Sequence, residues 1–440
     1  MSGGLLRICT AGSVDDGKST LIGRLLYDSQ SVYEDQVHSV AKASKNRNAG
    51  PIDFSLFTDG LRAEREQGIT IDVAYRYFAT ARRKFILADT PGHEQYTRNM
   101  ATGASTADVA ILLVDARNGV RTQSKRHARF ARLLGITDFV LAINKMDLVD
   151  YERDVFDKIQ DDFGDLLTGA SVHAIPMSAL HGDNVITRSD RTPYFNGLPL
   201  LEYLETVKVH RDATSGPLRF PVQLVVRPDD VFRGYAGQIV AGTVRPGDRV
   251  TAWPSGRSAR VKRIVTYDGD VAVGFAPMSV TLTLDDEIDI SRGDLLTPFD
   301  SARGQPPSVG QRFEAEVVWM DERPLDPARV YLLKHGTRTV TAEINHGLVL
   351  NQISTVQVTT ARPLVFDRYR ENRSTGSFIL VDPGTQFTCG AGMITEPLHA
   401  HTAHDAPLSV AERLAHLARR AGSDEEAAEA IRQALEELLT

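Results

Sequence analysis

The sequence of 440 residues has only two cysteines, Cys9 and Cys389, and no long apolar run. Two cysteines cannot build a disulfide framework, and this pair fits no metal or redox spacing, so we predict a reducing, cytoplasmic compartment. No stretch reaches the ~18 uncharged apolar residues that a membrane helix requires, and the residues before the first motif are too few for a signal peptide. A net charge of −7 disfavours a nucleic-acid partner, because nonspecific binding depends on neutralising phosphates.

Residues 1–210 alternate short apolar runs with longer segments of helical pattern. The apolar runs are Leu6–Ala11, Phe85–Ala88, Val109–Val114, Phe139–Ile143 and Val172–Pro176. Runs rich in Val, Ile and Leu are typical of strands that are buried on both faces. The segments between them include Gln123–Leu134 and Glu152–Leu167. This alternation predicts an α/β domain with a mostly parallel sheet and helices on both faces.

The pattern changes at about residue 216. Helical periodicity fades, and short alternating runs appear between turn signals such as Asp382-Pro-Gly384. This arrangement is typical of all-β barrels or sandwiches, and we favour barrels. We therefore expect two β-barrel domains, over residues 216–300 and 310–398, with Ser301–Gly310 as the linker between them.

The last part of the chain has a helical pattern again. Ser409-x-x-Glu412 and Ser423-x-x-Glu426 are both capping boxes, which mark the starts of helices. They predict a short helical hairpin over residues 405–440. Because the apolar face of a helix is usually core, we expect this hairpin to pack on its own β domain.

The first motif matches the phosphate-binding pattern Gly-x-x-x-x-Gly-Lys-[Ser/Thr] between an apolar run and a helix. Its residues, with the one that follows, are Gly12, Ser13, Val14, Asp15, Asp16, Gly17, Lys18, Ser19 and Thr20. The glycines allow a tight backbone whose N–H groups point at phosphate oxygens. We expect Lys18 to reach the β and γ phosphates and the Ser19 hydroxyl to ligate Mg²⁺. The pattern predicts a nucleoside triphosphate and leaves the base open; a capped turn is the alternative.

Two further segments are expected to face the phosphates. Asp89-Thr-Pro-Gly92 ends an apolar run, so the Asp89 carboxylate can hold Mg²⁺ directly or through water and the Gly92 N–H can contact the γ-phosphate. Thr70, at the end of Arg65–Thr70, is a candidate second hydroxyl ligand on a loop that orders around the γ-phosphate. The alternatives are an ordinary turn for the first segment and a charged loop for the second.

The base is expected to be read at the ends of the last two runs. In Asn144-Lys145-Met146-Asp147, the Asp147 carboxylate can accept two hydrogen bonds from guanine, whereas adenine would leave a buried charge unpaired. Such a site discriminates between bases by ~10⁴ or more. A backbone N–H after the last apolar run can bind the guanine oxygen. The residues of this segment are Ser178, Ala179 and Leu180. All these segments except Arg65–Thr70 follow strand ends, where open α/β sheets bind ligands. The order of the five segments predicts a GTPase.

These motifs resemble the translation-factor-type GTPase superfamily. Asp89–His93, Arg65–Thr70 and Asn144–Asp147 follow its pattern, and Gly237–Asp248 resembles its second, β-barrel domain. In that superfamily, the histidine that matches His93 positions the attacking water. The resemblance therefore implies a catalytic role for His93, beside Lys18 and the switch residue Thr70.

A closer resemblance is to the GTPase subunit of bacterial ATP sulfurylase, also called sulfate adenylyltransferase subunit 1. It rests on Asp59–Tyr77, His93–Ala104 and Asn372–Leu380, and it extends over about residues 5–397. Asp16 stands where elongation factors have histidine. The resemblance implies that GTP hydrolysis with Mg²⁺ drives formation of adenylyl sulfate from ATP and sulfate. It also implies that this synthesis takes place on a partner, the smaller catalytic subunit, in a heterodimer or larger complex.

One alternative shares the same fold and motifs: a translational GTPase that carries aminoacyl-tRNA. Asp16, the segment Asp59–Tyr77 and the lack of a long basic stretch favour the sulfurylase subunit. Some members of that family carry a fused adenylyl-sulfate kinase domain with its own phosphate loop. No second phosphate-loop pattern occurs in this sequence, so we do not expect that activity here.

Overall fold

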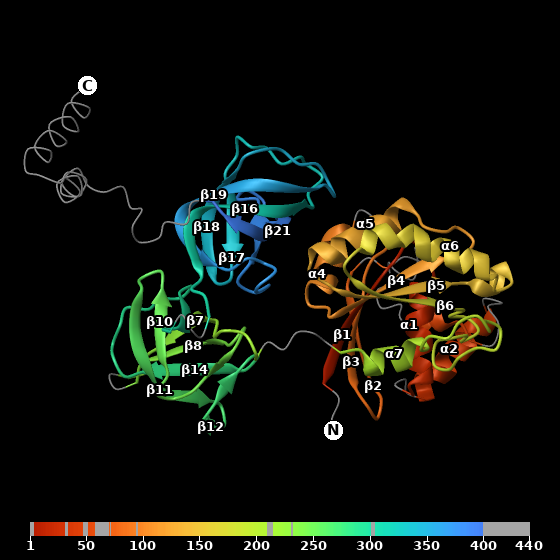
Figure 1. Cartoon of the computed structure of the whole chain (residues 1–440), viewed down its shortest axis with the longest axis horizontal. Helices are drawn as coiled ribbons and strands as arrows, with labels where there is room; N and C mark the ends of the chain where they lie inside the picture. The colour runs from red at the N-terminus through yellow and green to blue at the C-terminus, as the bar shows by residue number, and fades with distance from the viewer. Residues whose placement is uncertain are drawn as a thin grey trace, which may run out of the picture.

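The computed structural model describes residues 4–30, 34–46, 52–57, 70, 72–93, 96–208, 214–229, 232–300 and 304–398. Figure 1 shows an α/β domain followed by two β domains, called domain 2 and domain 3 below. The helical hairpin expected over residues 405–440 lies outside the described residues.

The α/β domain is built on a six-stranded sheet of order β2-β3-β1-β4-β5-β6. Its elements are β1 (Leu5–Ala11), α1 (Lys18–Asp28), α2 (Glu34–Asn46), η1 (Phe54–Phe57), β2 (Ala74–Ala79), β3 (Lys84–Asp89), α4 (Thr97–Ser105), β4 (Val109–Asp115), α5 (Thr122–Leu133), β5 (Asp138–Asn144), η3 (Met146–Val149), α6 (Arg153–Gly164), η4 (Asp165–Leu167), β6 (Ser171–Pro176) and α7 (Leu200–Thr206). Strand β2 is antiparallel to β3, and the other neighbouring strands are parallel. The predicted mostly parallel sheet is confirmed.

Helices cover both faces of this sheet. Leu21 and Leu25 of α1 and Leu204 of α7 pack on one face. Helices α4, α5 and α6 pack on the other face, where Phe130 and Phe156 are buried. Every residue of the central strands β4 and β5 is buried, which is why their sequences read as continuous apolar runs. The parallel strands bring the loops that follow β1, β3, β4 and β5 to one edge of the sheet.

Domain 2 contains nine strands, seven of them in one sheet of order β10-β15-β7-β8-β14-β11-β12. They are β7 (Phe220–Val226), β8 (Gly234–Gln238), β9 (Thr243–Val244), β10 (Arg249–Trp253), β11 (Arg257–Thr266), β12 (Gly269–Asp270), β13 (Gly274–Phe275), β14 (Ser279–Leu284) and β15 (Leu295–Pro298). An additional pairing of β10 with β11 closes the sheet on itself. The short strands β9 and β13 pair separately.

Domain 3 is a closed barrel of order β16-β19-β18-β17-β20-β21. Its strands are β16 (Ser308–Trp319), β17 (Tyr331–His335), β18 (Arg338–Ile344), β19 (Ile353–Phe366), β20 (Ser377–Val381) and β21 (Thr388–Pro397). Phe313, Trp319, Phe366 and Phe378 fill its core. The two predicted β-rich domains are confirmed. The domain bounds stay a prediction, and β16 begins two residues before the expected start of the last domain.

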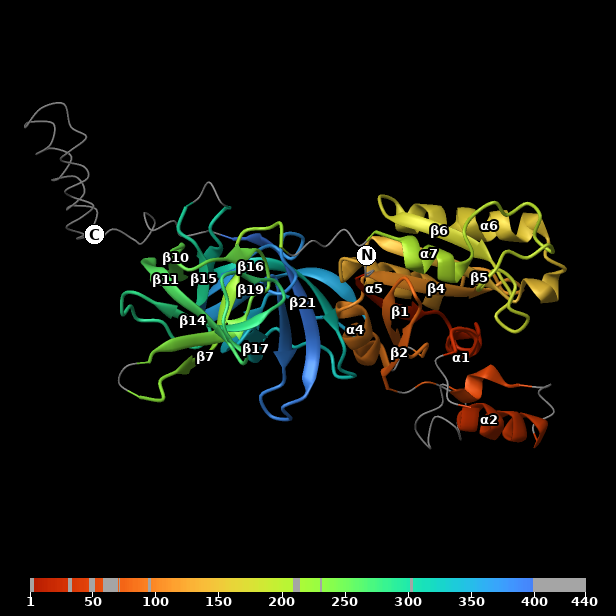
Figure 2. The ribbon, with the colours of Figure 1, turned by 90° about the horizontal axis from the view of Figure 1, so that it is seen from below.

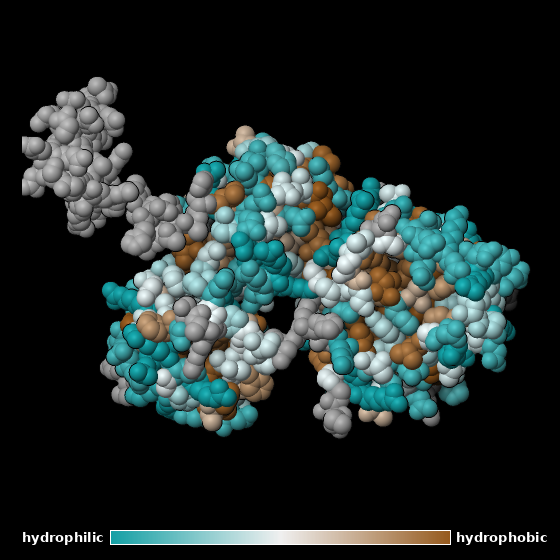
Figure 3. Space-filling view, in the orientation of Figure 1, coloured by the Kyte–Doolittle hydropathy of each residue, from teal (hydrophilic) through white to brown (hydrophobic). Residues whose placement is uncertain are grey.

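Domain 3 contacts both of the other domains. Its Asp367 and the Arg219 side chain of domain 2 form a buried ion pair. On its other side, Val318, Met320 and Met393 join the same apolar cluster as residues of α4 and α5. Figures 1 and 2 place α4 and α5 on the side of the α/β domain that faces domain 3. Hydrophobic side chains are visible on the facing side of domain 3 in Figure 3.

Candidate nucleotide site

The loops at the carboxyl edge of the α/β sheet surround a cavity of about 530 Å³. It is lined by Val14, Asp15, Gly17, Lys18, Ser19, Thr20, Ser55, Thr70, Gly92, His93, Arg117 and Lys145. All of these except Ser55 and Arg117 were expected at the site from the motifs. The structure therefore brings the phosphate loop, Thr70, the segment after β3 and Lys145 to one place. We call this the edge cavity. A larger cavity, of about 750 Å³, lies between α5 and domain 3 and is lined by none of the motif residues.

The phosphate loop turns sharply between β1 and α1. Asp15 and Gly17 both have positive φ, 68° and 94°. A Cβ atom at Gly17 would lie 2.4 Å from the Asn144 side chain, so this position combines a left-handed backbone with a close approach. Helix α1 begins at Lys18 without a side-chain cap. The first backbone N–H groups of α1 thus remain available to an anion in the edge cavity.

The Lys18 ammonium is held by backbone carbonyls inside the loop. Lys18 Nζ donates to the carbonyl oxygens of Gly12 at 3.0 Å and Ser13 at 2.8 Å. Burial lowers the pKa of Lys18, and attraction from the Asp89 carboxylate opposes that shift. A buried ammonium with neutral acceptors gains strongly from a nearby anion, because the interaction is screened little by water.

Three residues of the phosphate-loop motif do not line the edge cavity: Gly12, Ser13 and Asp16. The Asp16 carboxylate, 2% exposed, turns back and accepts the Ser13 N–H at 2.6 Å. Burial raises the pKa of Asp16 to about 6, against the opposing effect of the Ser13 hydrogen bond. Asp16 therefore holds the shape of the loop from within.

The segment after β3 packs directly on the phosphate loop. A Cβ atom at Gly92 would lie 2.6 Å from Lys18 Nζ and 2.8 Å from the Gly12 carbonyl oxygen, so only glycine fits there. His93 follows it and lines the edge cavity. Its ring centroid is 6.1 Å from that of Tyr96. This arrangement places the His93 imidazole at the edge cavity, which Lys18 also lines.

The oxygen atoms at the edge cavity suit Mg²⁺. Ser19 and Thr70 line it, whereas the buried Asp89 carboxylate lies behind and accepts the Thr10 hydroxyl at 3.3 Å. In the described part of the chain, no three His, Cys, Asp or Glu side chains gather as a metal site. Mg²⁺ usually binds through few protein oxygens and completes its shell with water and substrate phosphates. The two hydroxyls that line the edge cavity fit that preference.

Asn144 connects the phosphate loop to the loop after β6. Its Nδ2 donates to the Asp16 carbonyl oxygen at 2.8 Å, and its Oδ1 accepts the Ala179 N–H at 2.9 Å. The Ala179 N–H, one of the groups expected to bind the guanine oxygen, is thus already paired. Binding guanine through it requires this bond to be shared or exchanged. The sequence could not show this, because the two loops are 35 residues apart.

The other expected base-reading residues lie beyond the edge cavity. Asp147 Oδ2 is 3.8 Å from His181 Nε2, and neither Asp147 nor the segment Ser178–Leu180 lines the edge cavity. Leu180 is 53% exposed, and its carbonyl oxygen accepts a hydrogen bond from Arg24 at 3.2 Å. Lys145 does line the edge cavity, and its ammonium donates to the Asp15 carbonyl oxygen.

Asp115 was missed at the sequence level, although it directly follows the apolar run Val109–Val114. Its carboxylate pairs with Arg117 at 2.6 Å and with Lys145 at 3.0 Å, and so holds two cations at the rim of the edge cavity. Burial opposes ionisation, but hydrogen bonds from Arg117 and Lys145 prevail and lower the pKa of Asp115 to about 2. The signal that could have found it is the strand-end rule that found Asp89.

Two family models match the chain. Residues 4–210 match the elongation factor Tu GTP binding domain, and residues 312–395 match the GTP-eEF1A C-terminal domain-like family. Within the described residues, no helix is long and apolar enough to cross a membrane.

Curated relatives match over almost the whole chain. Sulfate adenylyltransferase subunit 1 of Alteromonas mediterranea is 49% identical over 92% of this chain and 89% of its own length. The protein of that name from Bacteroides thetaiotaomicron is 52% identical over 89% of this chain and 86% of its own length. The bifunctional enzyme CysN/CysC of Mycobacterium tuberculosis is 51% identical over 90% of this chain and 68% of its own length.

A solved structure, sup35 complexed with GDP, is 22% identical and covers 90% of this chain and 95% of that chain with a TM-score of 0.40, too low to add to the assignment. The curated relatives carry the assignment, because about half of the residues are identical over about nine-tenths of the chain. The chain belongs to the sulfate adenylyltransferase subunit 1 family, the GTPase subunits of that enzyme complex, within the translation-factor-type GTPase superfamily.

Proposed function

We propose that this chain binds GTP with Mg²⁺ in the edge cavity and hydrolyses it to drive sulfate adenylation on a partner subunit. The partner is the smaller catalytic subunit, where ATP and sulfate form adenylyl sulfate and pyrophosphate. The observation that carries the proposal is the convergence of Lys18, Ser19, Thr70 and His93 on one cavity. The names of the relatives, which describe a subunit 1 of sulfate adenylyltransferase, support it.

Binding of the phosphates follows from the phosphate loop. The Lys18 ammonium exchanges carbonyl contacts for charged phosphate oxygens, and the first N–H groups of α1 supply further donors. Gly92 leaves no side chain between Lys18 and the following loop, so its N–H can approach the terminal phosphate. Asp16 and Asn144 hold the loop in the shape that this binding needs.

Hydrolysis needs a water in line with the terminal phosphate. His93 lines the edge cavity beside Gly92, and we assign it the task of positioning that water. Ser19 and Thr70 would hold Mg²⁺, with Asp89 behind them; when bound, the ion neutralises charge on the phosphate oxygens. Thr70 belongs to the loop that we expect to respond to the γ-phosphate, so its contacts differ between GTP and GDP.

Guanine selection is assigned to the loop after β5. Asp147 supplies a carboxylate for the two guanine donors, and Lys145, two residues before it, donates to the Asp15 carbonyl oxygen of the phosphate loop. Asn144 links the base-reading loops to the phosphate loop. The loops assigned to the base and the loop assigned to the phosphates are therefore joined by hydrogen bonds.

Coupling to sulfate activation has a chemical reason. The mixed anhydride of phosphate and sulfate is an unfavourable product, and hydrolysis of a second nucleotide can drive its formation. We propose that the partner senses the segments around Thr70 and Gly92, whose order depends on the γ-phosphate. We do not propose the alternative role as a carrier of aminoacyl-tRNA, because relatives about half identical over about nine-tenths of the chain are named sulfate adenylyltransferase subunit 1.

The test is GTP turnover by the two-subunit complex with and without ATP and sulfate. We expect ATP with sulfate to stimulate GTP hydrolysis, and ATP without sulfate to stimulate it less. The control is a complex that carries Lys18→Ala, which should show little GTP hydrolysis under either condition. Turnover that ignores ATP and sulfate, with a fully assembled complex, would contradict the coupling.

A further inference from the structure

Helix α5 contacts the phosphate loop through two side chains that do not line the edge cavity, His127 and Ser124. The Gly12 N–H donates to His127 Nδ1 at 3.2 Å, and the Ser13 and Ser124 hydroxyl oxygens are 3.4 Å apart. His127 is only 4% exposed. Because Lys18 Nζ binds the Gly12 carbonyl oxygen at 3.0 Å, Gly12 is held by two side chains, one at its N–H and one at its carbonyl oxygen.

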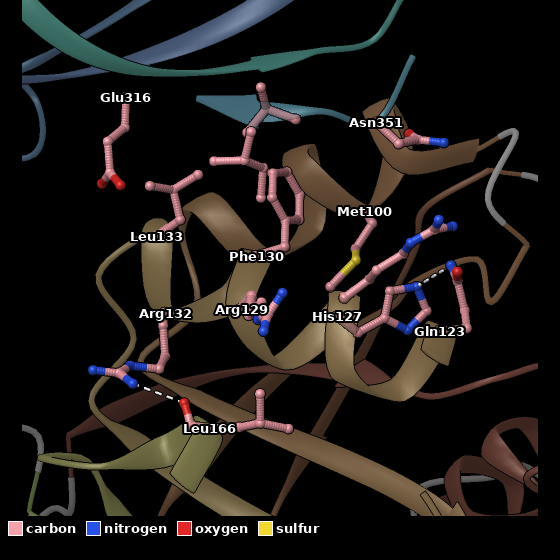
Figure 4. A pocket seen from close by; sticks show the side chains of 13 residues that line it. Met100, Gln123, His127, Arg129, Phe130, Arg132, Leu133, Leu166, Glu316 and Asn351 are labelled. Carbon is pink, nitrogen blue, oxygen red and sulfur yellow. Dashed lines mark hydrogen bonds between the residues drawn. The ribbon is translucent and has the colours of Figure 1, made fainter. Parts of the chain in front are cut away.

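The protonation of His127 follows from these contacts. Burial, with repulsion from Lys18 and Arg126, lowers the pKa of His127 to about 3, so the ring is neutral. Since Nδ1 accepts the Gly12 N–H, the single proton lies on Nε2. Nε2 is 2.9 Å from the side-chain amide of Gln123, the contact drawn in Figure 4. The structure places the Gln123 amide nitrogen at this contact, so an Nε2–H donor on His127 requires the Gln123 amide to be turned until its oxygen faces the ring.

The same helix contacts domain 3 along its other side. Phe130 and Leu134 share an apolar cluster with Val318 and Met320 of domain 3. Gln123 and His127 also line the larger cavity, which faces β16 and β19 (Figure 4). At the far end of α5, the Tyr369 hydroxyl donates to the Leu134 carbonyl oxygen at 2.9 Å. One rigid helix therefore touches the phosphate loop near its start and domain 3 near its end.

We propose that His127 is a positioning residue for nucleotide binding, which holds the phosphate loop in register with α5 through the Gly12 N–H and so links the loop to domain 3. This inference rests on the proposed function, because it assigns His127 to the same nucleotide. His127 does not line the edge cavity, so it acts on the nucleotide only through Gly12. When phosphates draw Lys18 away from the Gly12 carbonyl oxygen, the His127 bond is the contact that keeps Gly12 in place.

A purely structural histidine would act differently. If His127 were only structural, its loss would lower the stability of the protein, as the loss of any buried side chain does. If it is a positioning residue, loss of its one acceptor atom changes the rate of nucleotide release. Asparagine separates the two cases, because its Oδ1 lies near the position of histidine Nδ1 and can accept the same N–H. Phe130 offers a matched control, since it is buried on the same helix and its side chain has no acceptor for the Gly12 N–H.

The experiment measures release of a fluorescent GDP analogue from the full chain, together with unfolding in urea. We expect release to be about tenfold faster in His127→Ala, because the Gly12 N–H is left buried without its partner. His127→Asn should restore release to within about threefold of the wild type. Phe130→Leu should lower stability and leave release unchanged.

Release that follows stability across all three variants, or His127→Asn that releases GDP as fast as His127→Ala, would overturn the assignment of His127. If His127→Ala does not fold, the comparison of His127→Asn with Phe130→Leu still decides, because only an acceptor role predicts slow release from the former. Failure of the wild type to bind the GDP analogue would instead contradict the proposed function.

Discussion

Domain 3 meets its two neighbours through joints of opposite character. Towards domain 2, Arg219 binds both oxygens of Asp367 at 2.8 and 2.9 Å, with the side chains only 6% and 4% exposed, and Thr375 donates to the same carboxylate at 2.6 Å. Towards the α/β domain, a hydrogen bond from Tyr369 to Leu134 accompanies an apolar contact and a cavity of about 750 Å³. The first joint contains a buried ion pair, and the second leaves unfilled space beside an apolar contact.

This difference separates the roles of the two joints. Breaking a buried ion pair leaves an uncompensated charge, so domains 2 and 3 are expected to stay together in every nucleotide state. An apolar contact beside a cavity can shift at lower cost, because apolar contacts are not directional. We therefore expect the α/β–domain 3 joint to be the one that responds to the nucleotide, through α5.

The largest effect is expected from breaking the charged joint. Arg219→Met leaves Asp367 buried without its cation, and the free energy of unfolding should fall by about 3–5 kcal/mol. Urea unfolding measures the loss, and GDP affinity should not change. The control, Arg263→Met, removes an exposed ion pair with Asp270 in the same domain, 50% and 46% exposed, and should cost about 1 kcal/mol or less. Equal losses in the two variants would contradict the assigned strength of the Arg219–Asp367 joint.

Lys18→Ala tests whether the phosphate loop binds the nucleotide to which the looser joint is expected to respond. The variant loses charge-assisted contacts worth about 1.5–3 kcal/mol each, so GTP and GDP affinity should fall by about tenfold or more. Titration with a fluorescent nucleotide measures this, and Lys125→Ala, an exposed cation on α5, serves as the control. Wild-type affinity in Lys18→Ala would contradict the assignment of phosphate binding to this loop.

A smaller effect is expected at the looser joint. Tyr369→Phe removes only the hydroxyl that binds the Leu134 carbonyl oxygen, and should lower the free energy of unfolding by about 1 kcal/mol. Hydrogen exchange should rise at the end of α5 and stay unchanged in domain 2. Tyr77→Phe, at a side chain that is 68% exposed, is the matched control and should have no effect. Unchanged exchange at α5 would show that the contact contributes nothing to the joint.

The smallest effect depends on pH. Burial raises the pKa of Glu316, which lines the larger cavity, above its ordinary value of 4.5. The neutral form is favoured in the folded state, so stability from this group is present at low pH and is lost as the pH rises through the raised pKa. Glu316→Gln should remove that loss and raise the melting temperature slightly at pH 7 but not at pH 4. A change in melting temperature that is the same at pH 7 and pH 4 would contradict the burial of this carboxyl. Glu343→Gln, at an exposed position, is the control.

The sequence predicted the features that depend on residues close together in the chain. The apolar runs identified the parallel strands, and the motifs at their ends identified the loops that surround the edge cavity, because both signals are local. It did not identify His127, which meets Gly12 across 115 residues, or the Arg219–Asp367 pair, which spans 148 residues. Nor could it show that Asn144 already binds the Ala179 N–H. Such contacts arise only when separate segments pack together.

The two joints can be compared in one protein by measuring two distances with spin labels. Cys9 and Cys389 are buried, and burial raises the pKa of each thiol to about 12, so labels can be directed to new cysteines. Exposed positions Lys158, Asp268 and Glu343 lie in the α/β domain, domain 2 and domain 3. The Lys158–Glu343 pair then reports on the looser joint and the Asp268–Glu343 pair on the charged one.

Both pairs should be measured with GDP and with a non-hydrolysable GTP analogue in the presence of Mg²⁺. We expect the distance across the looser joint to differ between the two nucleotides and the distance across the charged joint to stay the same. A change in the Asp268–Glu343 distance, or no change in the Lys158–Glu343 distance, would contradict the division of roles between the two joints.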